Sequence, residues 1–220
     1  MKHRKGKTMK NFIISDEKRE FAVGETHMFG SPDAPEYFEW PVTTTKFGDD
    51  VDMTFIAQIN CNDLESELLP KEGILYFFYN AAEQPATPNV KGAAKVFWFN
   101  ENTDDLATLR LVDEDGNDTS PDPMALIPSD GDYDVSVITD DEDLVIDDGE
   151  EEFFDEFEEL DEEDSEKFNA TDDMIVLASF RAYEDDSISF TFEKGEELCF
   201  LINKKALEEK DFSDIRVLIV

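Results

Sequence analysis

The sequence of 220 residues has 40% hydrophobic and 12% aromatic side chains, which is enough to bury a sizeable core in one large domain or two small ones. Its formal net charge of −37 excludes nucleic acid as a direct ligand and favours basic partners. No run approaches the roughly 20 apolar residues that span a bilayer, so we expect a cytoplasmic protein that does not enter a membrane.

Residues 1–10 form a basic N-terminal extension, and Met9 is an alternative start. No apolar run of signal-peptide length follows this extension.

The first half of the chain has mostly the hydrophobic periodicity of strands. TFIAQI (54–59) and LATLRLV (106–112) fit strands of this kind. The continuous apolar runs ILYFFY (74–79) and KVFWF (95–99) are typical of central strands that are covered on both faces. Asn62 is placed to cap a short helix over residues 63–68, with Glu65 in the capping-box position.

Three aspartates near residue 115 raise the question of a calcium loop. Gly116 stands at the fourth place of the run that begins at Asp113, whereas an EF-hand loop needs glycine at its sixth place. The run therefore predicts a hairpin tip. We expect neither a metal nor a cofactor.

An acidic insertion follows at residues 139–168. The 18 acids and single lysine between Asp140 and Phe168 contribute −17 of the −37, which leaves −20 on the rest of the chain. Apolar side chains recur at helical spacing inside the insertion and predict a short amphipathic helix over 150–160, with a frayed tail to Lys167. Three interpretations stay open: docking onto the protein's own sheet, partner binding, and disorder. The candidate partner-binding residues are Phe153, Phe154, Phe157, Leu160, Asp155, Glu156 and Glu159.

Strands return after the insertion, and Asn203 is placed to cap a helix in KKALEEK (204–210). The expected strands are YDVSVITD (133–140), MIVLASF (174–180), SISFTF (187–192), ELCFLI (197–202) and RVLIV (216–220). One strand–helix–strand unit in each half shares an Ile-Asn pair followed by Leu-Glu. The prediction is an α+β fold of mostly antiparallel sheets with few short helices and two similar halves.

A block in the first half resembles the YwqG-like family, a bacterial domain of unknown function (number 1963). The resemblance lies in Gly30, Pro32 and Pro35, then Trp40-Pro41, Ala57-Gln58-Ile59, Leu69-Pro70, Gly73 and Leu75-Tyr76-Phe77-Phe78, together with the closing segment 199–220. Ser31 replaces the second glycine of the family pattern, and TFEKGEE stands where a tryptophan-glycine-aspartate motif is often seen. The resemblance implies one compact α+β domain whose halves are residues 11–138 and 169–220, and it supplies no activity.

Few residues suggest chemistry. Cys61 and Cys199 match no metal or redox spacing and read as free buried thiols. A couple between Cys61 and His27 has no local signature, and no nucleotide-binding or metalloprotease motif is present. The prolines of residues 30–41 fix a stiff loop, and its aromatic side chains either line a groove for an extended peptide or plug one end of the sheet. The candidate groove residues are Pro32, Pro35, Trp40 and Gln58.

Three functions follow from these features. The first is a non-catalytic interaction module, of immunity or adaptor type, whose acidic surface binds a basic protein. The second is an enzyme with an unrecognised site near Trp40, Gln58 and His27. The third is a DNA mimic, which would need ordered rows of carboxylates. The oligomeric state stays open.

Overall fold

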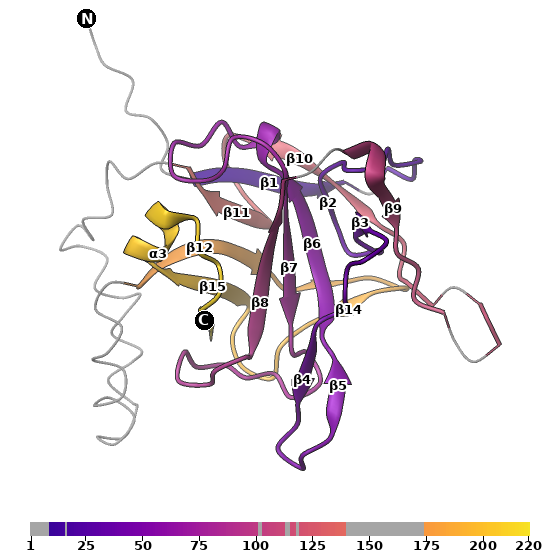
Figure 1. Cartoon of the computed structure of the whole chain (residues 1–220), viewed down its shortest axis with the longest axis vertical. Coiled ribbons are helices and arrows are strands. Elements are labelled where there is room, and N and C mark those ends of the chain that lie inside the picture. Colours follow the sequence, from indigo (N-terminus) through magenta and orange to yellow (C-terminus); the bar gives the residue numbers. More distant parts are fainter. Residues whose placement is uncertain (1–8, 16, 101–102, 113–114, 118, 140–173) are drawn as a thin grey trace, which may run out of the picture.

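The computed structural model describes residues 9–15, 17–100, 103–112, 115–117, 119–139 and 174–220. These residues form one antiparallel sheet of ten strands and three two-stranded ribbons (Figure 1). The predicted strand-rich, antiparallel architecture is confirmed. The α+β class overstates the helical content, because the described part of the chain has one α-helix, α3 (Lys204–Glu209), and is mostly β. The acidic insertion beyond Thr139 and its predicted helix lie outside the described residues.

The large sheet begins and ends with strands from opposite halves of the chain. In spatial order its strands are β16 (Ile215–Ile219), β15 (Glu197–Asn203), β12 (Met174–Arg181), β11 (Val135–Ile138), β1 (Met9–Ser15), β10 (Met124–Ser129), β2 (His27–Met28), β6 (Thr54–Asn60), β7 (Ile74–Tyr79) and β8 (Ala94–Phe99). The ribbons pair β3 (Asp33–Pro35) with β9 (Leu106–Thr108), β4 (Val42–Thr44) with β5 (Asp50–Asp52), and β13 (Tyr183–Glu184) with β14 (Ser189–Phe190).

The sheet curls (Figure 1), and its two end strands, β8 and β16, come into contact beside the main core. Phe77 of β7 lies 5.2 Å, between ring centroids, from both Phe180 of β12 and Phe200 of β15, and the last two rings are 5.4 Å apart. In the sheet order β7 is far from the neighbouring strands β12 and β15, and all three rings are fully buried. Edge-to-face aromatic packing of this kind therefore joins the two halves.

The strand β7 is buried on both faces, as the run ILYFFY predicts. Leu75, Phe77 and Tyr79 face the main core, while the alternate side chains enter a second cluster with Met53, Phe55 and Leu106. The second prediction of a central strand is wrong for β8, which forms an end of the sheet. Its apolar run arises because Phe38 packs against Phe97 on the outer face, at 5.4 Å between centroids.

The helix predicted over residues 63–68 is wrong. The chain forms only the 3-10 turn η1 (Cys61–Asp63), and its cap is Asn60, whose side chain accepts a hydrogen bond from the backbone N–H of Asn62. Glu65, the predicted capping-box residue, has a φ of 52° in the left-handed region and ends the turn. A second 3-10 turn, η2, spans Thr103–Asp105.

The cap predicted at Asn203 is confirmed. Its side chain accepts hydrogen bonds from the backbone N–H groups of Lys205 and Ala206 at the start of α3. Three predicted strands are shorter than expected, because LATLRLV keeps only β9, SISFTF only β14 and YDVSVITD only β11. Among the described residues, no helix has the length and apolar character needed to cross a membrane.

Gly73, just before β7, provides a test of this packing. Its φ is 97°, and a Cβ atom there would meet the Phe99 carbonyl oxygen and lie 2.7 Å from the Trp98 indole nitrogen. We expect Gly73→Ala to lower the free energy of unfolding by about 3 kcal/mol or more, from backbone strain and the clash together. Chemical denaturation measures this.

The matched control is Gly48→Ala in the β4–β5 turn. Gly48 also has a positive φ, of 90°, but no atom within 4 Å of an added Cβ. That variant should lose only about 1 kcal/mol. Equal losses at the two positions would contradict the contact argument.

Candidate functional site

The segment 30–41 and Gln58, which the sequence singles out, meet beside the short strand β2. Gln58 lies in β6 directly opposite His27 of β2. Its side chain is fully buried. A buried amide needs hydrogen-bond partners, since leaving it without them costs about 1–3 kcal/mol.

Gln58 finds those partners in two loops. Its Oε1 accepts a hydrogen bond from the Asp33 backbone N–H at 2.8 Å. Its Nε2 donates to the Glu25 carbonyl oxygen and to Asp33 Oδ2, each at 2.8 Å. One side chain thus ties the loop before β2 to the ribbon strand β3 (residues 33–35).

Asp33 is the second centre of this network, and it is 4% exposed. Besides Gln58, its carboxylate accepts hydrogen bonds from the Gly24 backbone N–H at 2.8 Å and from the Thr108 hydroxyl at 2.6 Å. The Tyr76 hydroxyl donates to the Asp33 backbone oxygen. Four donors in a buried site satisfy both the carboxylate and its peptide group, so the cluster is a closed structural network.

His27 is buried beside this network and is held by its own bonds. Its Nδ1 lies 2.8 Å from the Phe29 carbonyl oxygen, and its ring packs edge-on against Phe21 and Phe55. Burial lowers the pKa of His27, although Asp33 pulls it in the opposite direction. The imidazole is therefore a neutral core group whose Nδ1–H donates to a carbonyl.

The two thiols are likewise packed in the core. Cys61 is 2% exposed and Cys199 is 1% exposed. Burial raises the pKa of each thiol to about 12, so both are protonated at neutral pH. A protonated, buried thiol is a poor nucleophile, and the contacts of His27 described above do not include Cys61.

The remaining groove candidates also form packing. Pro32 and Pro35 are buried at the β3–β9 ribbon. Trp40 is half-buried, with its indole N–H donating to the Met53 carbonyl oxygen at 2.8 Å and its ring 5.3 Å from Phe78. This arrangement is that of aromatics that cover one face of the sheet, and peptide binding here stays a prediction.

The chain beyond Trp40 leaves the body of the protein as a hairpin arm, defined by β4, β5 and their turn, residues 42–52 (Figure 1). The turn is closed by hydrogen bonds from Thr45 N–H to Asp49 O at 2.8 Å and from Gly48 N–H to Thr45 O at 2.9 Å. Phe47 at the tip is 82% exposed. An aromatic ring presented to solvent on a rigid turn is available for contact with another molecule.

Other candidate residues can be placed only in part. Phe153, Phe154, Phe157, Leu160, Asp155, Glu156 and Glu159 lie outside the described residues. Within the described ranges, no group of three or more His, Cys, Asp or Glu side chains is arranged to hold a metal ion.

Sequence reasoning missed Asp33 and Asn60. Asn60 caps η1 and also donates its Nδ2 to the Gly24 carbonyl oxygen at 2.9 Å, which fixes the same loop as Gln58. The sequence feature that could have pointed to Asp33 is its position between Pro32 and Pro35. These prolines restrict the backbone, so the carboxylate is held in one orientation.

Gln58 gives the sharpest test of the network. We expect Gln58→Met, which keeps the volume, to lower the free energy of unfolding by about 3 kcal/mol at every pH, because three polar partners lose their bonds. Gln58→Glu should be at least as damaging at pH 7, where a second carboxylate would face Asp33. Its deficit should shrink toward pH 5, as the new carboxyl group takes up a proton that can bond Asp33. If both variants stay within about 0.5 kcal/mol of the unmodified protein, the network does not hold the loops.

His27 predicts a dependence of stability on pH. Its pKa is lowered in the folded state, so the unfolded chain binds the proton more readily, and stability is lost as the pH falls below the ordinary value of about 6.5. Relative to His27→Gln, the unmodified protein should lose at most about 1.4 kcal/mol per pH unit between pH 7 and pH 5, with no change in the difference above pH 7.5. Urea unfolding at each pH measures the difference. A gap that is constant with pH would show that His27 is not buried in its neutral form.

Comparison with known proteins adds one finding. The family model described as "Domain of unknown function (DUF1963)" matches residues 26–219, from the loop that precedes β2 to the end of β16. No curated protein matches the chain. The match takes in Gln58, Asp33, the hairpin arm and every strand of the large sheet except β1. The chain therefore belongs to the DUF1963 family.

Proposed function

We propose that this protein is a non-catalytic protein-binding module, of adaptor or immunity type, that recognises a basic partner. The observation that carries the proposal is the hairpin arm with its neighbour Tyr37. Three apolar side chains stand out there, Phe47, Tyr37 and Val42, which are 82%, 66% and 49% exposed. Large exposed apolar side chains gathered in one segment of a soluble protein mark an interaction surface.

The charge around these side chains favours a basic partner. The exposed acids of the segment outnumber its exposed base, Lys46, and they are Glu36, Glu39, Asp49, Asp50 and Asp52. Apolar anchors within a charged rim are the usual anatomy of a specific protein interface. The net charge of −37 would speed the approach of a positively charged protein over longer distances.

The burial of the nucleophile candidates supports a role in binding over catalysis. Neither thiol is exposed, and His27 is occupied by the Phe29 carbonyl oxygen. A catalytic base must reach the proton it removes, and packing as tight as that around His27 leaves no room for a substrate.

The acidic insertion would supply a second contact to the same partner. Its apolar positions, Phe153, Phe157 and Leu160, have the spacing of one helix face, and acids surround them. This part of the proposal rests on the sequence alone.

We also propose that the two halves of the fold repeat one unit. The strands β6 and β7 pair antiparallel around η1, and β15 and β16 pair antiparallel around α3. Asn60 and Asn203 hold the same place in the two units, each with extended backbone and a side chain that accepts from the N–H two residues on. A repeated unit would present two related surfaces to a partner.

Affinity capture with the full chain as bait tests the proposed function. Binding partners from the source cell should be basic, and they should be retained at about 50 mM salt and released at about 500 mM, because screening weakens charge–charge attraction. The dissociation constant of the purified partner should rise about tenfold with Phe47→Ala and less with Asp49→Asn/Asp52→Asn.

Val112→Ala serves as the control, since Val112 is 59% exposed and lies outside the hairpin arm. The affinity of the Val112→Ala variant for the partner should match that of the unmodified protein. Binding that ignores salt, or that survives both Phe47→Ala and deletion of residues 140–167, would refute the proposal.

A further inference from the structure

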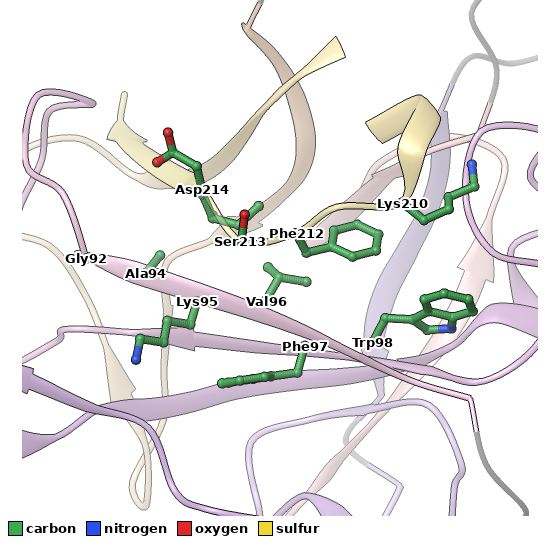
Figure 2. Close-up of a pocket in the computed structure, with 11 residues that line it drawn as sticks. Gly92, Ala94, Lys95, Val96, Phe97, Trp98, Lys210, Phe212, Ser213 and Asp214 are labelled. Atoms are coloured by element: carbon green, nitrogen blue, oxygen red, sulfur yellow. The ribbon is translucent and has the colours of Figure 1, made fainter. Parts of the chain in front are cut away.

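A cavity of about 480 Å³ lies at the seam where the two ends of the sheet approach each other (Figure 2). One wall is the strand β8 (Ala94–Phe99), and the other is the segment from Lys210 to Ile215 that links α3 to β16. None of the residues of the Gln58 network lines it. Its volume is within the usual range for small-ligand sites.

The wall formed by β8 carries backbone groups that have no partner strand. Asn80 N–H donates to Ala93 O at 2.9 Å, so by the alternation of an antiparallel ladder Lys95 and Phe97 bond to β7. The N–H and C=O groups of Ala94, Val96 and Trp98 therefore point away from β7 toward the seam. In the described part of the chain, β8 pairs with β7 alone.

The opposite wall has the same property. Val220 and Glu197 exchange backbone hydrogen bonds, so the alternation directs the backbone groups of Ile215 and Val217 outward from β15. The two sheet ends come close here without forming a ladder in the described structure. The seam thus offers donors and acceptors from both sides.

One end of the cavity is positively charged. Lys210 lines it and donates its ammonium group to the Leu68 carbonyl oxygen, while Lys71 donates to the Ser66 carbonyl oxygen of the same loop. An ammonium group has three donors, so each lysine keeps N–H groups for a further partner. Burial, and then the charge of Lys71, lower the pKa of Lys210, while Glu208 raises it. An anion placed beside Lys210 would stabilise the charged form of a group that burial disfavours.

The acid of the lining is already neutralised. Asp214 lies at the other end of the cavity from Lys210 (Figure 2) and accepts hydrogen bonds from the Arg216 guanidinium at 2.6 and 3.1 Å. Among the residues that line the cavity, the two lysines, Lys95 and Lys210, outnumber the one acid, although the whole protein carries −37.

Apolar surface adjoins the lysine. Figure 2 shows Trp98, Phe212 and Lys210 at the same end of the cavity, with Val96 beneath Phe212. The Trp98 indole N–H donates to the Glu72 carbonyl oxygen at 3.0 Å, so the ring offers its apolar surface. Phe212 and Val96 are buried.

We propose that this seam binds a compact ligand with an apolar body and one carboxylate, the carboxylate on Lys210 and the body against Trp98, Val96 and Phe212. The free backbone groups of β8 bond the polar atoms near the carboxylate. The loop 66–72 at one end and the Asp214–Arg216 pair at the other limit the ligand to a small molecule or the last residues of a chain. The carboxylate is that of a free organic acid or of a peptide C-terminus.

Titration of the full chain with two probes tests this site. The probes are phenylacetate, a free acid, and N-acetyl-glycyl-phenylalanine, a chain end with its carboxylate. In ¹H–¹⁵N spectra the shifts should centre on Val96, Trp98 and Phe212 and saturate with a dissociation constant of about 1 mM or below, as is usual for small ligands of this size. The probe that binds more tightly identifies the source of the carboxylate.

Two comparisons separate the site from non-specific binding. Phenylacetamide, which has the same shape without the charge, should bind at least about tenfold more weakly than phenylacetate. Lys210→Met should weaken both acids by at least about tenfold, whereas Lys205→Met, on the exposed face of α3 where its side chain is 80% exposed, should leave binding unchanged. Absence of saturable shifts with both probes, or equal binding of acid and amide to the unmodified protein, would overturn the proposal. The amide comparison decides the matter even if Lys210→Met fails to fold.

Discussion

The continuity of the sheet depends on the amide group of Gln58. The strand β2 (His27–Met28) has only two residues, yet it is the link between β10 and β6 and so joins six strands on one side to three on the other. So short a strand makes few ladder bonds of its own, and isolated pairs of this kind are marginal in water. Gln58 compensates by fixing the loops on either side of β2, through Glu25 and Asp33. A buried polar network in which every group is satisfied specifies one arrangement of the backbone.

The rest of the molecule separates apolar packing from charge. The rings of Phe77, Phe180 and Phe200 pack β7 against β12 and β15 within the main core. Most carboxylates of the described residues are exposed, where they interact with solvent and with one another through a high dielectric. Asp33 is the buried acid among these residues, and its donors are fixed by the fold. The buried apolar side chains therefore stabilise the fold, and the charged side chains lie on the outer surface.

The sequence predicted those elements whose pattern depends on local rules. The alternation of β7 and the cap at Asn203 require only neighbouring residues, and both are confirmed. The cap at Asn62 failed because Asn60, two residues earlier, makes the same bond after β6 ends, and the sequence alone does not rank the two. The place of β8 at an end of the sheet could not be read either, because Phe38, distant in sequence, covers its outer face, so that both faces of β8 are apolar as in a central strand. Asp33 was missed for a related reason, since its partners come from four separate segments.

The open edges of the two end strands, β16 and β8, are covered to different extents. The loop between β7 and β8 covers the edge of β16. Ala86 O accepts a hydrogen bond from Ile219 N–H at 3.1 Å, and Pro88 O accepts one from the Arg216 guanidinium at 3.0 Å. Along β8, the described structure provides only proximity to the segment after α3 and one lysine, Lys95, near the start of the strand. Open strand edges are templates for pairing with other chains, and a lysine in the strand discourages such pairing. Fibrils or swapped dimers of this protein, if they form on heating, would thus grow from the β8 side, and the occupant of the seam would act as their inhibitor.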